Sequence, residues 1–418
     1  MGMKRTFADS SINVHHYEEC IETQKRILEK SNMSKGNKQL ITDFINFCEN
    51  GEGKIGLSRV RLYYYALRRI GESTDKNFKD MTEKDIVNVL AKLKEHKIRN
   101  GNSYSEHTME DFRKAISKFW RWLYYEQYFG EAPPQIKRIK VRCKKTRTEP
   151  EIYSTEEIKT IINNMSNSRD KAFISCLYDL QARVGELLSR QIKHVRHNEE
   201  GDIQIMIDST KTGIIHWETL FESVSDFNMW LSLHPERNTP NAPLWITMKA
   251  KGEIIPLKYA SIRKIFNRIC KQQGIRKGLK NNLHMLRKSK ATHDMANGVP
   301  IPFIESRGSW IKGSRALQDC YIAVMQKDKD NAYKKRYQMK VNNETANGIE
   351  LKRCSRCNAI MKHDLRFCSG CGMPVDMKTW IEKKEIETKT ASLIDPVMLS
   401  EMVKKVVLEE MSRRKVDA

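Results

Sequence analysis

Four cysteines near the C-terminal end place the tightest constraint on how this chain can fold. Cys354 and Cys357 form one Cys-x-x-Cys pair, Cys368 and Cys371 form a second, and ten residues separate the pairs. Each such turn can present two thiolates to one tetrahedral ion, and a glycine directly after the second pair suits a tight turn. Four thiolates leave no open coordination position, so the pattern predicts one structural Zn²⁺ per chain and no catalytic metal.

The remaining cysteines and the charge balance narrow the class of protein. The other six cysteines are scattered singly, which is typical of a reducing compartment rather than of a disulfide framework. Lys and Arg number 75 against 52 Asp and Glu, so the net charge is +23. Such an excess attracts polyanions, chiefly nucleic acid or an anionic membrane. The sequence has no apolar run near 18 residues and no signal-peptide pattern behind Met1, which argues against a membrane or secreted protein.

Residues 1–135 have the pattern of a small helical bundle. One helix is predicted from Ser58, as N-cap, to Ile70, and a second opens with the capping pair Thr82 and Asp85. A third runs from about Thr108 with apolar residues at helical spacing. Its aromatic residues favour a core position, with base stacking as the alternative; they are Trp120, Trp122, Tyr124 and Tyr125.

A basic segment over 136–150 follows the Pro133-Pro134 pair. Between Lys137 and Arg147 there is no acidic residue and there are seven basic ones, namely Lys137, Arg138, Lys140, Arg142, Lys144, Lys145 and Arg147. A solvated spacer is the plain interpretation. Because the segment joins two domains of a strongly basic chain, we favour a linker that lies along DNA phosphates.

The next domain, 151–345, is predicted to be mostly helical with one small sheet. Ser154 and Glu157 form a capping box, and a long helical stretch is expected from Lys171 to about Arg190. Apolar and polar residues then alternate over 203–208 and again over 215–219, which predicts a β-hairpin with Lys211 at its tip. From Leu257 to about Tyr337 the pattern is helical again.

Breaking a DNA strand without ATP or a catalytic metal sets clear chemical requirements. Fixed positive charge must surround the non-bridging oxygens of the phosphate, and arginine supplies it with paired hydrogen bonds. A hydroxyl must attack in line, and a general acid must protonate the leaving 5′ oxygen. A tyrosine nucleophile would conserve the bond energy as a phosphotyrosine ester for rejoining.

Three stretches of the second domain, read together, resemble the tyrosine recombinase (phage integrase) family. Residues 182–188 (ARVGELL) are similar to its Arg-x-x-Glu-Leu box, although Gln181-Ala182 stands where the family often has Gly-Leu. Residues 283–287 (LHMLR) match its His-x-x-Arg box. Residues 308–310 (GSW), then Gly313-Ser314 and a downstream tyrosine, look like its Gly-His motif with tryptophan in place of histidine, a variant that resembles archaeal integrases.

The resemblance implies a role for each matching residue. Arg183 and Arg287 would clamp the scissile phosphate, and Glu186 would orient its neighbours. His284 would hydrogen-bond a non-bridging oxygen or serve as a base. Lys211 would be the general acid, with Lys249 and Lys251 as alternatives, and Trp310 would pack against the site and donate its indole N–H. The nucleophile would be Tyr321, which follows Trp310 by 11 residues, in preference to Tyr333 and Tyr337. His293 is expected to be a helix-packing residue.

The resemblance also implies a mainly α fold. An N-terminal helical core-binding (SAM-like) DNA-binding domain would occupy 1–135, a basic linker 136–150, and an α-rich catalytic domain with a small β-sheet 151–345. The cysteine pairs over 350–378 resemble a zinc ribbon, and a C-terminal helical tail would fill 379–418. We expect metal removal to melt the ribbon and leave a distant catalytic core folded.

The implied function is site-specific recombination of double-stranded DNA. A homotetramer would join two short sites through 3′-phosphotyrosine intermediates and a Holliday junction, with no cofactor in the chemistry. The archaeal-like variant favours integration or excision of a mobile element, in the cytoplasm and associated with the nucleoid. The alternatives are resolution of chromosome or plasmid dimers, a type IB topoisomerase, and a non-catalytic DNA-binding regulator on the same fold.

Overall fold

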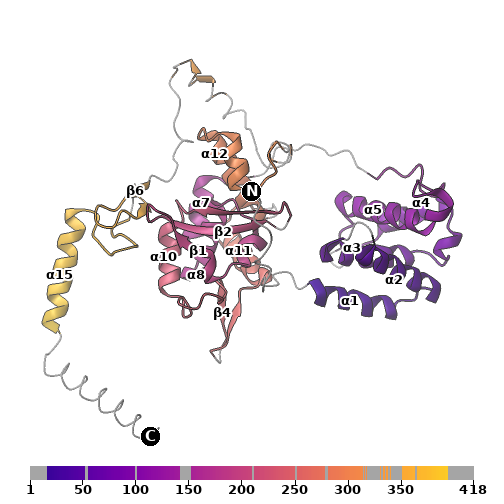
Figure 1. The fold of residues 1–418 in the computed structure, drawn as a ribbon, viewed down its shortest axis with the longest axis horizontal. Helices are drawn as coiled ribbons and strands as arrows, with labels where there is room; N and C mark the ends of the chain where they lie inside the picture. Colours follow the sequence, from indigo (N-terminus) through magenta and orange to yellow (C-terminus); the bar gives the residue numbers. More distant parts are fainter. Residues whose placement is uncertain are drawn as a thin grey trace, which may run out of the picture. The chain divides into compact units, whose positions relative to one another are not determined.

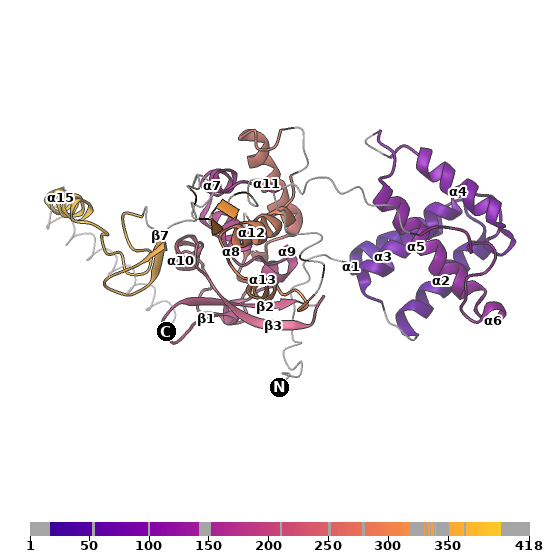
Figure 2. The same ribbon diagram turned by 90° about the horizontal axis from the view of Figure 1, so that it is seen from above.

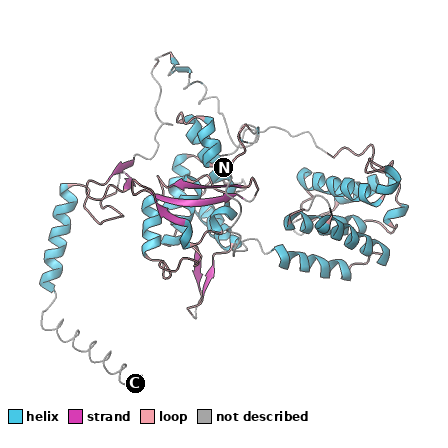
Figure 3. Ribbon diagram, in the orientation of Figure 1, coloured by secondary structure: helices cyan, strands magenta, loops and turns pink. Residues whose placement is uncertain are grey.

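The computed structural model describes two compact units, one formed by His15–Thr148 and the other built mainly from Glu149 onward. The described residues are 17–51, 55–98, 101–141, 152–209, 211–249, 252–277, 281–313, 315, 317, 330, 333–334, 336–337, 339, 351–362 and 365–393. Helices predominate in both units, and among the described residues short strands occur only in the second, as Figure 3 shows. The mainly α prediction is therefore confirmed.

The first unit is a helical bundle. Its elements are α1 (Tyr17–Lys30), α2 (Lys35–Asn50), α3 (Leu57–Gly71), the 3₁₀ turn η1 (Phe78–Asp80), α4 (Glu83–Glu95), α5 (Glu106–Leu123) and α6 (Tyr125–Tyr128). Thr82 and Asp85 cap α4 reciprocally, as predicted. The predicted cap at Ser58 is wrong: the N-cap of α3 is Gly56, which places Ser58 inside the helix.

Aromatic side chains fill the centre of this bundle. Phe119 of α5 meets Phe44 edge-on at 5.3 Å and Phe78 at 5.2 Å between ring centroids. Trp120 is fully buried, and Trp122 and Tyr124 pack partly buried against the same core. The core interpretation therefore holds for these three aromatic residues. It fails for Tyr125, which lies past the end of α5 and is 61% exposed.

The second unit combines a helical layer with small antiparallel sheets (Figure 1). Its helices are α7 (Thr155–Asn163), α8 (Ser168–Asp179), α9 (Val184–Leu188), α10 (Val224–Ser232), α11 (Tyr259–Gln272), α12 (His284–Ala296), α13 (Ile301–Arg307) and α15 (Met377–Leu393), with the 3₁₀ turn η2 (Ile192–His194). Its strands are β1 (Val195–His197), β2 (Ile203–Ser209), β3 (Ile214–Thr219), β4 (Ile246–Met248), β5 (Ile254–Pro256), β6 (Leu351–Arg353) and β7 (Ile360–Lys362).

The predicted hairpin is present as β2 and β3. Ser209 pairs with Ile214 next to the turn, and Ile205 pairs with Glu218 farther along. Alternate residues of β2 are buried, as its sequence predicts, because one face of the strand packs on the core. Strand β1 extends the sheet to three strands, and β4 and β5 form a separate hairpin. Neither strand β1 nor the β4–β5 hairpin was predicted from the sequence. In Figure 2 the three-stranded sheet lies along one side of the helices.

The long helix predicted from Lys171 to about Arg190 is interrupted. Helix α8 ends at Asp179, and α9 begins at Val184 after a short turn. Gln181 in this turn has φ +51°, a left-handed backbone that no α-helix can continue through. The prediction of one continuous helix was wrong because apolar spacing alone does not reveal a backbone break. The consequence is functional, since the break places Arg183 at a helix N-terminus.

The cysteine-rich segment packs against the rest of the second unit and is not distant from it. Arg353 of β6 donates to both carboxylate oxygens of Asp202, at 2.9 and 3.1 Å. Strand β7 packs against α10, and Ile360 is 6% exposed within the apolar core of the unit. The expectation of a separate ribbon is therefore corrected. Of the helical tail predicted over 379–418, helix α15 is described as far as Leu393, and residues 394–418 lie outside the described residues. Among the described helices, none is both long and apolar enough to cross a bilayer.

Candidate active site

Arg183 is the N-cap residue of α9, directly after the break that follows α8, and its side chain is partly buried. The guanidinium donates to a carboxylate oxygen of Glu186 at 2.5 Å and to Oγ of Ser209 at 2.8 Å. The backbone N–H of Arg183 also donates to Glu186, at 2.8 Å. Burial of Glu186 disfavours its charge, but the charge and hydrogen bonds of Arg183 outweigh it and lower the pKa of the carboxyl. Glu186 therefore stays ionised and holds the Arg183 side chain by a charged hydrogen bond.

Arg287 is the second arginine and is fully buried. Its two terminal nitrogens donate to main-chain carbonyls, one to Gln181 and the other to Gly308 at 2.6 Å. Since Gln181 lies two residues before Arg183, one short turn contacts Arg287 and carries Arg183. The two arginines of the sequence motifs are thus brought to the same place.

Trp310 closes the site on one side. Its ring is 5% exposed and packs with Ala291, Ile304 and Leu317. The guanidinium carbon of Arg287 lies 3.7 Å from the centre of the Trp310 ring, a cation–π contact. Gly308 makes this arrangement possible, because a Cβ there would lie only 1.8 Å from Cζ3 of Trp310.

His284 and Lys211 complete the cluster of polar residues. His284 opens α12 one helical turn before Arg287, so both side chains lie on one face of the helix. Part of His284 reaches solvent, yet enough protein packs around the imidazole that burial lowers its pKa. The charges of Arg287, Arg183 and Lys211 lower it further, to about 4. His284 is therefore neutral at pH 7 and able to accept a proton.

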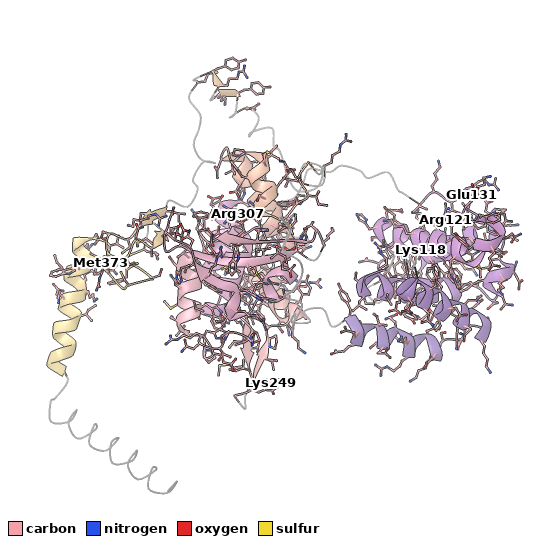
Figure 4. All side chains as sticks on the ribbon, in the orientation of Figure 1. Lys118, Arg121, Glu131, Lys249, Arg307 and Met373 are labelled. Carbon is pink, nitrogen blue, oxygen red and sulfur yellow. The ribbon has the colours of Figure 1, made fainter. Side chains whose placement is uncertain are left out.

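Lys211 lies in the exposed turn between β2 and β3, two residues beyond the Ser209 that contacts Arg183. The rival Lys249 lies at the end of the separate β4–β5 hairpin, as Figure 4 shows, where it pairs with Glu253 at 2.7 Å. Lys251 is outside the described residues. Lys211 is the lysine whose charge acts on His284, which favours it over Lys249.

Comparison with known proteins shows what this part of the chain is similar to. Residues 152–327 match the phage integrase family. The matched segment makes up less than half of the chain and lies in the unit that carries the candidate site. It is 23% identical over 265 residues to transposase A of transposon Tn554 from Staphylococcus aureus, covering 61% of this chain and 70% of the transposase. Tyrosine recombinase XerA from Pyrococcus horikoshii is 24% identical over 277 residues, covering 64% and 84%.

The fold of the recombinase agrees with that assignment. A lambda integrase tetramer bound to a Holliday junction superposes with a TM-score of 0.53 at 15% identity, covering 71% of this chain and 80% of that one. At such identity the likeness concerns the fold alone. The family match and the similarity to known recombinases show that the chain is an enzyme of DNA strand breakage and rejoining, a site-specific tyrosine recombinase.

Some predicted site residues of the recombinase lie outside the described part of the chain. Tyr321 is one of them, as are Arg142, Lys144, Lys145 and Arg147 of the basic linker. Lys137, Arg138 and Lys140 are described and exposed, and Arg138 bonds Glu83 at 2.8 and 3.1 Å. The alternative tyrosines, Tyr333 and Tyr337, are 62% and 66% exposed.

The four cysteines of the recombinase form a cluster suited to a metal ion. Their sulfur atoms all lie within 4.8 Å of one another. Cys354 and Cys371 are 3.7 Å apart and Cys357 and Cys368 are 3.6 Å apart, sulfur to sulfur. Tetrahedral zinc with ordinary Zn–S bonds requires about 3.8 Å between sulfurs, so the donor set fits. The cluster can hold a metal ion such as zinc.

Sequence reasoning missed a buried polar network behind the site. Arg307, at the end of α13, bonds the carboxylate of Asp179 at 2.9 Å and that of Glu218 at 2.9 Å, and Figure 4 shows it within the body of the catalytic unit. These partners come from α8 and β3, far from Arg307 in sequence, so no local pattern signals them. His293 was predicted to be a helix-packing residue. It also makes a polar contact, because its Nδ1 lies 2.8 Å from the hydroxyl oxygen of Tyr178.

Proposed function

We propose that this recombinase cuts DNA through Tyr321, forming a 3′-phosphotyrosine and a free 5′ hydroxyl. The phenol oxygen of Tyr321 attacks the scissile phosphorus and forms the new P–O bond. The bond from phosphorus to the 5′ oxygen breaks, and that oxygen takes a proton from Lys211. The phenol proton passes to His284, and rejoining reverses each transfer.

Arg183 and Arg287 stabilise the charge that develops on the non-bridging oxygens in this scheme. Both are held by hydrogen bonds to the protein, Arg183 by Glu186 and Ser209 and Arg287 by two carbonyls. Preorganised cations need no rearrangement during the reaction, which is the main source of such stabilisation. The ring of Trp310 packs against the Arg287 guanidinium through the cation–π contact.

The observation that carries the proposal is that the turn bearing Arg183 accepts the hydrogen bond of Arg287, which follows His284 by one turn of α12. The charges of Arg287, Arg183 and Lys211 act together with burial to lower the pKa of His284. A concentration of positive charge attracts an anionic phosphate and favours the ionised form of a phenol brought near it. A DNA-binding regulator without catalysis would have no use for this arrangement.

Covalent trapping tests the proposal. DNA captured by the protein is first sequenced to find its site, and a nicked version of that site is then incubated with the protein and run on a denaturing gel. Wild type should form a covalent adduct, and Tyr321→Phe should bind the DNA and form none. Tyr333→Phe and Tyr337→Phe are matched controls and should form the adduct. An adduct from Tyr321→Phe would overturn the assignment.

The biological setting that we favour is integration and excision of a mobile element by a homotetramer on two double-stranded sites. The support comes from the transposon-encoded relative and from the tryptophan variant of the third motif. Resolution of chromosome or plasmid dimers by the same chemistry is the second candidate, and the likeness to tyrosine recombinase XerA, which covers 84% of that recombinase, is compatible with either setting. Recombination of paired sites placed on one plasmid or on two distinguishes these settings.

The four cysteines are proposed to bind one structural zinc ion per chain. Cys354, Cys357, Cys368 and Cys371 would each supply one thiolate, and the N–H groups of Arg356 and Gly370 donate to two of the sulfurs at 3.4 Å. Such N–H donation stabilises thiolate charge. Metal analysis of protein purified without chelator should find one zinc per chain, and a metal-free protein would refute the assignment.

A further inference from the structure

Gln181 occupies an unfavourable backbone conformation at the centre of the recombinase. Its φ is +51°, a region that favours glycine, and its side chain is fully buried. The side-chain oxygen is buried as well, and no described residue donates a hydrogen bond to it. Glycine would avoid both penalties. A glutamine held here at such a cost calls for a physical reason.

The reason lies in two contacts that Gln181 makes with one helix. Its main-chain carbonyl accepts a hydrogen bond from Arg287, and its side-chain amide donates to the carboxylate of Asp294 at 2.6 Å. Arg287 and Asp294 are both on α12 and seven residues apart, which is two helical turns. Gln181 therefore forms hydrogen bonds with α12 at two positions on the same face of that helix.

The carboxylate of Asp294, which accepts the second of these hydrogen bonds, is itself held in place. Asp294 pairs with the ammonium of Lys290 at 2.9 Å, and the same ammonium bonds Glu222 at 2.5 Å. The carboxylate that receives the Gln181 amide therefore cannot swing away without breaking a buried ion pair. The side chain of Gln181 is anchored on a rigid support.

We propose that Gln181 is a positioning residue that sets the register between Arg183 and Arg287. This inference rests on the proposed function, in which the two arginines clamp the phosphate. Arg183 follows Gln181 by two residues, and Arg287 bonds the Gln181 carbonyl, so rotation of this peptide would move one cation relative to the other. Because Gln181 is fully buried, it acts on DNA only through the two arginines.

Two substitutions separate positioning from simple packing. Gln181→Ala removes the amide and keeps the backbone penalty, whereas Gln181→Gly removes both, so the glycine variant should melt at the higher temperature of the two. If Gln181 only fills space, cleavage should follow stability, and the glycine variant should cut like wild type. If Gln181 positions the arginines, both variants should cut slowly, because both lose the anchor on Asp294.

The experiment measures three quantities on full-length protein: the melting temperature, DNA affinity, and the first-order rate of adduct formation at saturating nicked DNA. For both variants we expect unchanged affinity and a rate lower by roughly 10- to 100-fold, the usual cost of displacing a catalytic group by up to 1 Å. Gln191→Ala is the matched control: it removes a buried amide that donates to the Asn241 carbonyl at 2.9 Å, away from both arginines, and should cut at the wild-type rate.

Two outcomes separate this inference from the proposed function. A wild-type rate for Gln181→Gly would overturn the positioning role and leave the clamp intact. A wild-type rate for Arg287→Ala, measured in the same series, would overturn the clamp itself. Slow cutting by both Gln181 variants, with normal Gln191→Ala and inactive Arg287→Ala, supports both.

Discussion

Adding one methyl group at Gly308 should both destabilise the recombinase and slow cleavage. A Cβ on Gly308 would lie 1.8, 2.3 and 2.6 Å from three ring atoms of Trp310. Carbon atoms in contact are normally about 3.5 Å apart, so the ring must move by roughly 1.5 Å. Trp310 is 5% exposed and packed on Ala291 and Ile304, so it has little room to do so. Overpacking of this kind costs about 1–3 kcal/mol.

The same displacement should reach the chemistry through Arg287. Its guanidinium lies 3.7 Å from the Trp310 ring centre, and a cation–π contact of this kind contributes about 0.5–2 kcal/mol. Moving Arg287 by about 1 Å should slow adduct formation by up to roughly 100-fold. The backbone of Gly308 has φ −87°, which alanine adopts freely, so the clash with the ring is the dominant cost.

A double-mutant cycle tests this explanation. Urea denaturation gives the unfolding free energy of Gly308→Ala, Trp310→Ala and the double variant, and the alanine at 308 should cost almost nothing once the ring is gone. Adduct formation by Gly308→Ala is measured at saturating DNA. A Gly308→Ala protein with wild-type stability and a wild-type rate would refute the reasoning, as would an equal stability loss in both backgrounds.

Three further predictions follow from the docked cysteine cluster, the linker and His284. Chelation of the metal should unfold the ribbon and also lower the melting temperature of the catalytic unit, because Ile360 lies in that unit's core and Arg353 is bonded to Asp202. A calorimetric transition of the catalytic unit that chelation leaves unchanged would contradict this prediction. Replacing Lys140, Arg142, Lys144 and Lys145 with Ala should flatten the slope of log affinity against log salt by about 1 to 4, and an unchanged slope would make the linker a spacer. His284 should titrate by NMR near its lowered pKa of about 4, below the ordinary value of about 6.5. Between these two pKa values the unfolded chain binds a proton at His284 that the folded chain does not bind. The His284 contribution to the free energy of unfolding should therefore be complete above about pH 6.5 and decrease as the pH falls toward 4, and His284→Gln should abolish this pH-dependent contribution.

Local features of the sequence were sufficient to predict much of the fold. The capping boxes at Thr82 and Ser154 start helices as expected, because their hydrogen bonds involve residues only three apart. The alternation in 203–219 predicts the β2–β3 hairpin, because one face of a strand is buried. Short strands such as β4 and β5 carry too few residues for an alternation to be recognised.

The arrangement of the site depends on contacts that no local pattern reveals. The break at Gln181 divides a predicted helix into two and places Arg183 at the N-terminus of the second, yet the apolar spacing runs through it. Arg307 and Asp179 are 128 residues apart in sequence, so their pairing follows only from the packed tertiary structure. The family motifs named Arg183, His284, Arg287 and Trp310, and the structure adds how the protein holds them.

Peptide mapping of the covalent protein–DNA adduct tests the central claim most directly. Wild-type protein is trapped on a nicked recombination site, digested with protease, and the peptide that carries the nucleotide is sequenced by mass spectrometry. The account predicts a 3′-phosphodiester on the hydroxyl of Tyr321. An adduct on Tyr333 or Tyr337, or no adduct on a site that the protein binds, would contradict it.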